Sequence, residues 1–215
     1  FPYHIFTRLY DVMVSSIIDY GSAVWGQKSF SCINAVQNRA SRYFLGLGKR
    51  APSAAAQGDL GWRLPEDRQW LCIARQWLRL CNKNRSRMCH KIFRWCVLHA
   101  SRKKKNWVYH CREYYKMIDM KSIIDVDYGI KCDMIKEDFI QKQNVTTERK
   151  WLEGINSRTG RLGKGNKLRT YCQFKKKFEV EGYVKMSIPK THRKAMSVFR
   201  AGVAPINIEL LRYGP

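Results

Sequence analysis

Acidic side chains are scarce in this chain. The 215 residues include 17 Asp and Glu against 41 Lys and Arg, which gives a formal net charge of +24 at pH 7. Such an excess of one sign repels itself in a compact chain unless an anion offsets it. The simplest such anion is a nucleic acid, because Lys and Arg replace the counterions condensed on its phosphates. The scarcity of acids therefore points to a polyanionic partner.

Long hydrophobic runs are also missing. The best apolar stretch, residues 12–18, contains two serines and lies between Asp11 and Asp19, so it is too short to span a bilayer. No signal-peptide pattern opens the chain, and its first residue is Phe rather than Met. We therefore expect an intracellular piece of a longer product, nuclear or cytoplasmic, without a membrane partner.

The chain lacks the C-x-x-C spacing of common zinc and redox sites. Its eight cysteines, in the absence of an export signal, are best interpreted as reduced thiols. Cys89, Cys96 and His99 fall on one face of an expected helix, with His110 nearby in sequence, and thiolates and imidazoles can form a tetrahedral zinc site. Small core residues one heptad apart explain the two cysteines more simply. We expect no cofactor, and zinc binding by these four residues stays an open question.

Signatures of catalysis are missing as well. The chain has no G-x-S-x-G nucleophile motif, no histidine in a general-base pattern, and only a near-miss to a phosphate-binding P-loop at residues 160–167. Asp125 and Asp127 follow two isoleucines and form a carboxylate pair that could hold two Mg²⁺ ions for phosphoryl transfer. We expect that the chain is not an enzyme by itself, and keep a metal-dependent nuclease using this pair as an alternative.

The positive charge that is present is segmental. Residues 1–60 carry a net charge of +3 and residues 61–124 a net charge of +12. Residues 125–155 carry −2 and residues 156–215 carry +11. Two strongly basic blocks flanking a mildly acidic one are typical of two phosphate-facing surfaces rather than of a uniform solubility charge.

Apolar residues recur with helical spacing along most of the chain, so we expect a mainly α fold. We predict a helical bundle over residues 1–82 and a basic helical extension over residues 83–215, with a second boundary near residues 118–133. Residues 46–62 are expected to form a loop or an irregular short helix, and residues 123–130 a short strand or linker. The expected helices cover residues 9–18, 33–45, 65–83, 86–98, 106–117, 134–155, 167–178 and 192–200.

The helix that begins at Pro65 has the clearest amphipathic pattern. Pro65 suits a first helical turn, and the two acids after it complement the helix dipole. The face expected to pack against a core contains Trp70, Ile73, Ala74, Trp77 and Cys81. The opposite face contains Arg68, Arg75, Arg79 and Lys83. This basic face is either a solvated surface or a row of phosphate contacts, and the near-absence of acids in the next forty residues favours the second interpretation.

Further cations extend this candidate phosphate-binding surface. The run 102–105 joins two expected helices, and the segment 164–177 contains basic residues in an expected loop and the helix that follows it. The additional candidate contacts are Lys103, Lys104, Lys105, Lys164, Lys167, Arg169, Lys175, Lys176 and Lys177.

Two strings in the first third of the chain, IIDYGSAVWG and INAVQNRASRYFLGLGKRAPSAAAQGDLGW, resemble the thumb of a known family. That family is the non-LTR (LINE-type) retrotransposon reverse transcriptases, in which the thumb follows the polymerase palm. KLRTYCQFKKKFEVEGYVK and HRKAMSVFRAGVAPINIELLRY are similar to its basic C-terminal region, which precedes a Cys/His zinc module. The matching thumb positions are Tyr20, Gly21, Trp25, Gln37, Arg39, Ala40, Leu45, Gly46, Pro52, Leu60, Gly61 and Trp62.

The resemblance implies a thumb-like bundle and a C-terminal extension that grip RNA and DNA, namely the template and the primer duplex. The family's catalytic signature, an aromatic-Ala-Asp-Asp hairpin, is absent, so polymerase chemistry would reside in an upstream palm domain of the same polyprotein. Contacts to a duplex and its template would be mostly to phosphate and sugar, and therefore tolerant of sequence. A remnant of a decayed or domesticated element with a structural role is the other alternative.

Overall fold

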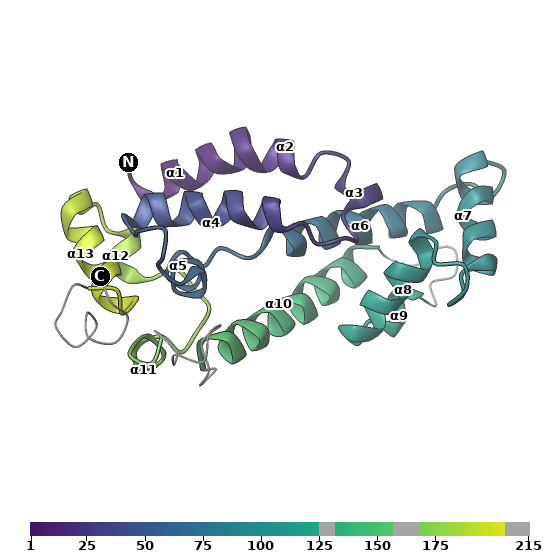
Figure 1. The fold of residues 1–215 in the computed structure, drawn as a ribbon. Helices are drawn as coiled ribbons and strands as arrows, with labels where there is room; N and C mark the ends of the chain where they lie inside the picture. Colours follow the sequence, from purple (N-terminus) through teal and green to yellow (C-terminus); the bar gives the residue numbers. More distant parts are fainter. Residues whose placement is uncertain (125–131, 157–167, 205–215) are drawn as a thin grey trace. The chain divides into compact units, whose positions relative to one another are not determined.

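The structure is a computed structural model that describes residues 1–124, 132–156 and 168–204. These residues form a mainly α-helical protein, as the sequence predicts, and within them β-pairing is limited to an isolated bridge between Leu60 and Val180. The helices in chain order (Figure 1) are α1 (Tyr3–Tyr10), the π-helix η1 (Asp11–Ser15), α2 (Ser16–Ile18), α3 (Ser22–Trp25), α4 (Ser31–Leu45), α5 (Ser53–Leu60), α6 (Pro65–Cys81), α7 (Met88–His99), α8 (Trp107–Met117), α9 (Lys121–Ile124), α10 (Cys132–Asn156), α11 (Tyr171–Phe174), α12 (Gly182–Lys185) and α13 (Lys190–Arg200).

The chain divides into two compact units, each assembled from segments that are separated in the sequence. Unit 1 takes the described residues of Phe1–Ser16, Ser31–Leu64 and Thr147–Pro215, and unit 2 takes those of Ile17–Phe30 and Pro65–Thr146. This division differs from the predicted one, because residue 82 lies inside unit 2. Local periodicity identifies the face that a helix buries, but it does not show which distant segment covers that face.

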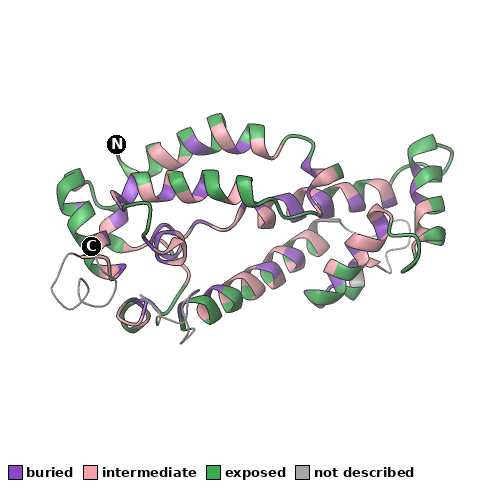
Figure 2. Ribbon diagram, in the orientation of Figure 1, coloured by how far each residue is buried: buried purple, intermediate pink, exposed green. Residues whose placement is uncertain are grey.

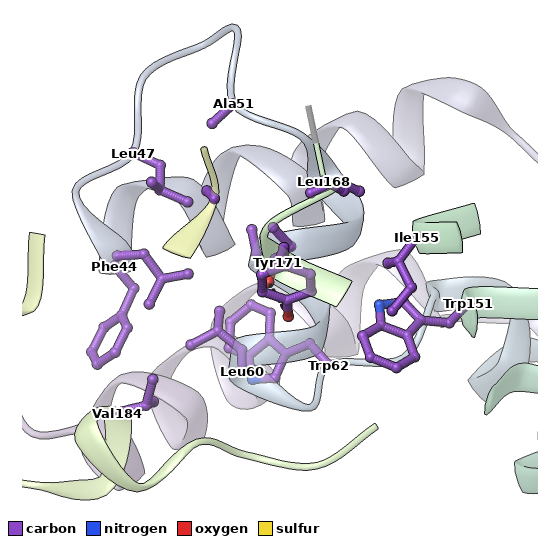
Figure 3. Close-up of a cluster of buried hydrophobic side chains, with 14 of the residues drawn as sticks. Phe44, Leu47, Ala51, Leu60, Trp62, Trp151, Ile155, Leu168, Tyr171 and Val184 are labelled. Carbon is purple, nitrogen blue, oxygen red and sulfur yellow. Dashed lines mark hydrogen bonds between the residues drawn. The ribbon is translucent and has the colours of Figure 1, made fainter. Parts of the chain in front are cut away.

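The core of unit 1 is centred on the small residues of α5. Ala55, Ala56 and Leu60 are fully buried there, in a segment for which the sequence predicted a loop or an irregular short helix. Gly58 permits the close approach of two aromatic rings, because a Cβ at this position would lie 2.5 Å from the Tyr171 hydroxyl and 2.6 Å from the Trp151 ring. Figure 3 shows these two side chains in the same cluster as Leu60.

Helices α1 and α4 add an aromatic layer to unit 1. The Phe6 ring lies 4.8 Å from that of Phe44, and Tyr10 lies 4.7 Å from Trp62, measured between ring centroids. The buried face of α4 includes Gln37, which donates a hydrogen bond to the Arg63 carbonyl. Helix α4 therefore buries polar as well as apolar side chains, and one of them bonds the segment after α5.

Unit 2 is built around α6, whose predicted apolar face is confirmed in full: all five of its residues are buried. Trp77 is central, and its indole N–H donates to the Ile123 carbonyl at 2.9 Å. The Trp70 ring stacks on Tyr114 with centroids 3.7 Å apart. The Trp107 indole N–H donates to the Ala23 carbonyl at 3.0 Å and so joins α8 to α3.

Two sequence predictions need correction or limitation. The basic helix expected over residues 167–178 is much shorter: α11 ends at Phe174, and Lys175 already has extended backbone angles. The strand or linker expected over 123–130 begins inside α9, and the remainder lies outside the described residues. No helix in the part of the chain that the structure describes is both long and apolar enough to cross a bilayer.

Candidate nucleic-acid interface

The four cations predicted on α6 and just after it have different environments. Arg75, Arg79 and Lys83 are exposed. Arg68 instead pairs with Asp19, its Nε lying 2.9 Å from the carboxylate Oδ2, and its side chain is one-third exposed. The pair attaches the start of α6 to the turn before α3, so Arg68 has a structural role. The exposed basic row therefore begins at Arg75.

Exposed cations continue from α6 into α7, where the sequence analysis did not nominate any. Arg87, Lys91 and Arg94 are all exposed and follow one another at spacings of four and three. Figure 2 shows that much of α7 is exposed. Side chains at these spacings lie on one face of a helix. The same spacing is visible in the sequence, and it could have identified this row once α7 was predicted.

The lysine run between α7 and α8 lies on a tight turn. The Lys104 amide donates to the Ser101 hydroxyl at 3.1 Å, and the Asn106 amide donates to the Lys104 carbonyl at 2.9 Å. Asn106 also caps α8 by accepting from the Tyr109 amide at 2.9 Å, and its side-chain N–H donates to the Cys96 carbonyl at 2.8 Å. The turn is thus held at both ends while Lys103, Lys104 and Lys105 remain exposed.

The electrostatic character of this region follows from its lack of acids. Residues 68–112 contain thirteen Lys and Arg and no Asp or Glu. Among the residues that the structure describes, no ion pair involves Arg75, Arg79, Lys83 or the three lysines of the turn. We call these six residues, together with Arg87, Lys91 and Arg94, the basic surface of unit 2. Positive charge without local partners is what a phosphate-binding surface requires.

The second basic block, residues 156–215, differs from the basic surface of unit 2. Several of its cations are largely buried inside unit 1 and do not face solvent. Asp59 is buried and receives Arg200 through two contacts, Nη2 to Oδ1 at 3.2 Å and Nε to Oδ2 at 3.3 Å. The hydroxyls of Tyr171 and Tyr183 donate to the same carboxylate at 3.0 and 2.6 Å. Burial alone would lower the pKa of Arg200, but Asp59 and then Glu181 outweigh it and raise the pKa. We call this group the Asp59 cluster.

Lys175 is a corrected prediction. It was expected to contact phosphate, but its side chain is 2% exposed, and its ammonium group pairs with Glu181 and donates to the Glu179 carbonyl. A buried, paired ammonium cannot reach a phosphate in solution. Of its neighbours, Lys176 and Lys177 are exposed, and Arg169 is half-buried. The chain leaves its helical path at Lys175, and this turns the side chain into the core.

The remaining candidates do not form a site in the described structure. Cys89 is exposed, Cys96 is half-buried, and the His99 ring bonds the Trp95 carbonyl of its own helix. Across residues 1–124, 132–156 and 168–204, no three metal-ligating side chains are close enough to hold an ion. Four further candidates lie outside the described residues: Asp125, Asp127, Lys164 and Lys167.

A pocket on unit 1 was not anticipated from the sequence. Its volume is about 430 Å³, and its lining residues are Arg39, Arg42, Tyr43, Leu47 and Lys49. Arg42 is tethered in place, because its guanidinium donates to the Ala51 carbonyl at 3.0 Å and to the Ser53 hydroxyl. Burial lowers the pKa of this arginine. Unit 1 therefore has a small cationic concavity of its own.

Comparison with known proteins gives no further constraint. The chain matches no protein-family model, no curated protein and no solved structure.

Proposed function

We propose that this chain is a nucleic-acid-binding piece of a non-LTR retrotransposon reverse transcriptase, which grips template RNA and primer duplex through their backbone phosphates. The observation that supports the proposal most strongly is the basic surface of unit 2. Its cations are exposed on α6, on α7 and on the turn before α8, within a stretch of 45 residues that contains no acid.

Backbone contact is favoured over base reading because of the kind of side chain present. The surface consists of Lys and Arg on α6, on α7, on the segment between these helices and on one tight turn, and such groups neutralise phosphates regardless of sequence. A polymerase has to hold any template that it copies, and sequence-tolerant binding suits that task. The polymerase reaction itself would belong to an upstream palm domain, with this chain as a non-catalytic part.

The test is the salt dependence of RNA and duplex binding by the whole chain. For single strands each phosphate contact contributes about 0.7, and for duplexes about 0.9, to the slope of log K against log salt. The triple variant Arg75→Gln, Arg79→Gln, Lys83→Gln should bind more weakly, and its slope should be smaller by about 2 for single strands and about 3 for duplexes. Lys103→Gln, Lys104→Gln, Lys105→Gln should show a similar change.

A matched control removes the same charge elsewhere. Lys116, Arg149 and Lys150 are exposed, and acidic residues lie near each of them in sequence, including Glu113, which pairs with Lys116. Changing these three to Gln should leave the slope almost unchanged. Equal slopes for the wild type and the two test variants would contradict the assignment of the surface.

Two outcomes would favour the alternatives. If the folded chain binds neither RNA nor DNA at low salt, a structural remnant of a decayed element is the better account. If the chain cleaves nucleic acid in the presence of Mg²⁺, and Asp125→Asn abolishes cleavage, the nuclease reading replaces the proposal.

A further inference from the structure

Helix α7 exposes a row of large apolar side chains that the core does not use. Met88 is 69% exposed, Ile92 55% and Trp95 57%. These residues and His99 recur at spacings of four, three and four, so they lie along one side of the helix. The core of unit 2 takes a different side of α7, where Phe93 and His90 are buried. We call the exposed row the α7 apolar row.

The cations of α7 run alongside this row on one side only. Arg87, Lys91 and Arg94 precede Met88, Ile92 and Trp95 by one residue each, so a basic row and an apolar row extend in parallel. The other flank of the apolar row carries Cys89 and Cys96 in place of Lys or Arg. Helix α7 is thus asymmetric across its exposed surface, with charge on one flank and none on the other.

Trp95 is held in a defined orientation within the apolar row. Its indole stacks on the His99 imidazole, with ring centroids 4.4 Å apart and planes 23° from parallel. His99 is itself fixed by a 2.8 Å hydrogen bond between its Nδ1 and the Trp95 carbonyl. Over half of Trp95 nevertheless stays in contact with solvent. A flat ring that is ordered and still exposed is suited to stacking on another flat ring.

We propose that α7 binds a single strand of nucleic acid, with Arg87, Lys91 and Arg94 on its phosphates and Trp95 stacked on an unpaired base. A single strand has the same asymmetry as the helix, because its phosphates lie along one edge and its bases along the other. In a duplex the bases are paired and stacked inside, so a duplex offers charge to the basic row but no ring to Trp95. This inference rests on the proposed function and adds to it the strandedness of the ligand.

An anionic membrane surface is the occupant that these observations favour less. A helix lying in a bilayer interface needs a wide apolar face, usually with Lys and Arg along its polar side. The side of α7 opposite the apolar row is not fully available, because the buried residues Phe93 and His90 belong to the core of unit 2. The one-sided placement of charge matches a strand better than a lipid surface.

The test uses the full chain with three labelled probes of equal length. These are a single-stranded oligouridine, a duplex, and an abasic single strand that keeps the phosphates but has no bases. Trp95→Ala should weaken binding of the oligouridine about tenfold, while binding of the duplex and of the abasic strand stays unchanged. Trp95→Tyr, which keeps an aromatic ring, should restore most of the affinity. Met134→Ala is the control, since Met134 is a 68% exposed apolar side chain with Glu137 and Asp138 close by in the sequence.

The outcomes separate this inference from the proposed function. If Trp95→Ala binds all three probes as the wild type does, while neutralising Arg75, Arg79 and Lys83 weakens binding, the stacking role is overturned and backbone binding stands. If no probe binds the wild type at low salt, both fail. If phosphatidylserine vesicles bind in a Trp95-dependent way and the oligouridine does not, the surface recognises membranes, and the inference is overturned.

Discussion

A single buried carboxylate organises the polar interior of unit 1. Asp59 is 2% exposed and is contacted by Arg200, Tyr171 and Tyr183, which come from distant parts of the chain. Arg200 also reaches Glu181 at 3.2 Å, so the cluster contains charges of both signs. Breaking one member of such a group is costly, because its partners stay buried without compensation.

We predict that Asp59→Asn destabilises unit 1 by about 3 kcal/mol. The change keeps the size of the side chain but leaves the Arg200 guanidinium without its closest buried counter-charge. Urea unfolding would measure the loss. Glu153→Gln is the control, because Glu153 is exposed and its neutralisation should alter stability by about 0.5 kcal/mol or less. Equal unfolding midpoints for the two variants would contradict a structural role for Asp59.

The two tyrosines of the Asp59 cluster predict a loss of stability in alkali. Burial, and then the charge of Asp59, raises the pKa of Tyr171 and Tyr183 above the ordinary value. Below pH of about 10 both the folded and the unfolded states keep these protons. As pH rises further, the unfolded state releases them first, so the free energy of unfolding should fall.

Urea midpoints measured between about pH 8 and pH 11 would follow this loss. Ultraviolet absorbance of tyrosinate should also lag behind that of an unfolded reference. Tyr183→Phe has no proton to release, so its decline with pH should be shallower than that of the wild type. A stability that is constant across this range would refute the prediction.

At the scale of single residues, the sequence does not show whether a charged side chain is exposed or pairs with another residue of the fold. Lys175 and Lys176 are adjacent and of the same type, yet one is 2% exposed and paired with Glu181 while the other is exposed. Arg68 and Arg75 were predicted on the same helix face, yet only Arg68 pairs with Asp19. The partner in each case is set by tertiary packing, which the helical period of one segment does not encode.

Among the elements, the turn between α7 and α8 depends on one side chain. Asn106 caps α8 with its carbonyl oxygen and donates its amide to the Cys96 carbonyl. An Asn immediately before an apolar periodic run is a recognised helix-start signal, so the cap could be read from sequence. The bond to Cys96 could not, because it links two separate helices.

We predict that Asn106→Ala lowers the stability of α8 by about 1 kcal/mol and loosens the lysine turn. Asn106→Asp keeps the cap acceptor but loses the donor to Cys96, so it should preserve α8 while still loosening the turn. Hydrogen exchange of the amides in residues 103–110 would resolve the two effects. If Asn106→Asp exchanged like the wild type throughout, the bond to Cys96 would have no role in holding the turn.

Helices α5 and α6 differ in how strongly their own sequences predict them. Helix α6 was predicted well because a strong apolar period and a suitable first turn coincide in it. Helix α5 was not clearly predicted because its segment is rich in Ala and Gly, whose small side chains make a weak apolar stripe. Its burial is decided by Trp151 and Tyr171, which are brought to it from far along the chain.

At the scale of the whole molecule, each unit is assembled from segments that are separated in the sequence. Removal of the last helices should therefore affect one unit and not the other. Unit 1 draws core residues from α11, α12 and α13, including Tyr171 and Val184, whereas unit 2 uses none of these helices. A chain ending at Asn156 should therefore lose amide protection in α5 and retain it in α6. Hydrogen exchange measures both helices in one sample, so α6 serves as the internal reference. Retained protection of α5 would show that the last three helices are dispensable for unit 1.

Because unit 1 is assembled from segments far apart in the sequence, its core cannot be completed until late in translation. Helices α1, α4 and α5 leave the ribosome before α6, yet Asp59 can pair with Arg200 only after residue 200 has been made. During translation the segments of unit 2 can pack together before unit 1 is complete. The apolar surface of α5 stays uncovered until its core partners, such as Tyr171, have been made. Contacts between such distant segments form slowly, and intermediates that expose apolar surface are prone to aggregate. The helices of unit 1 that are made before α6 are thus the ones that would depend longest on a chaperone.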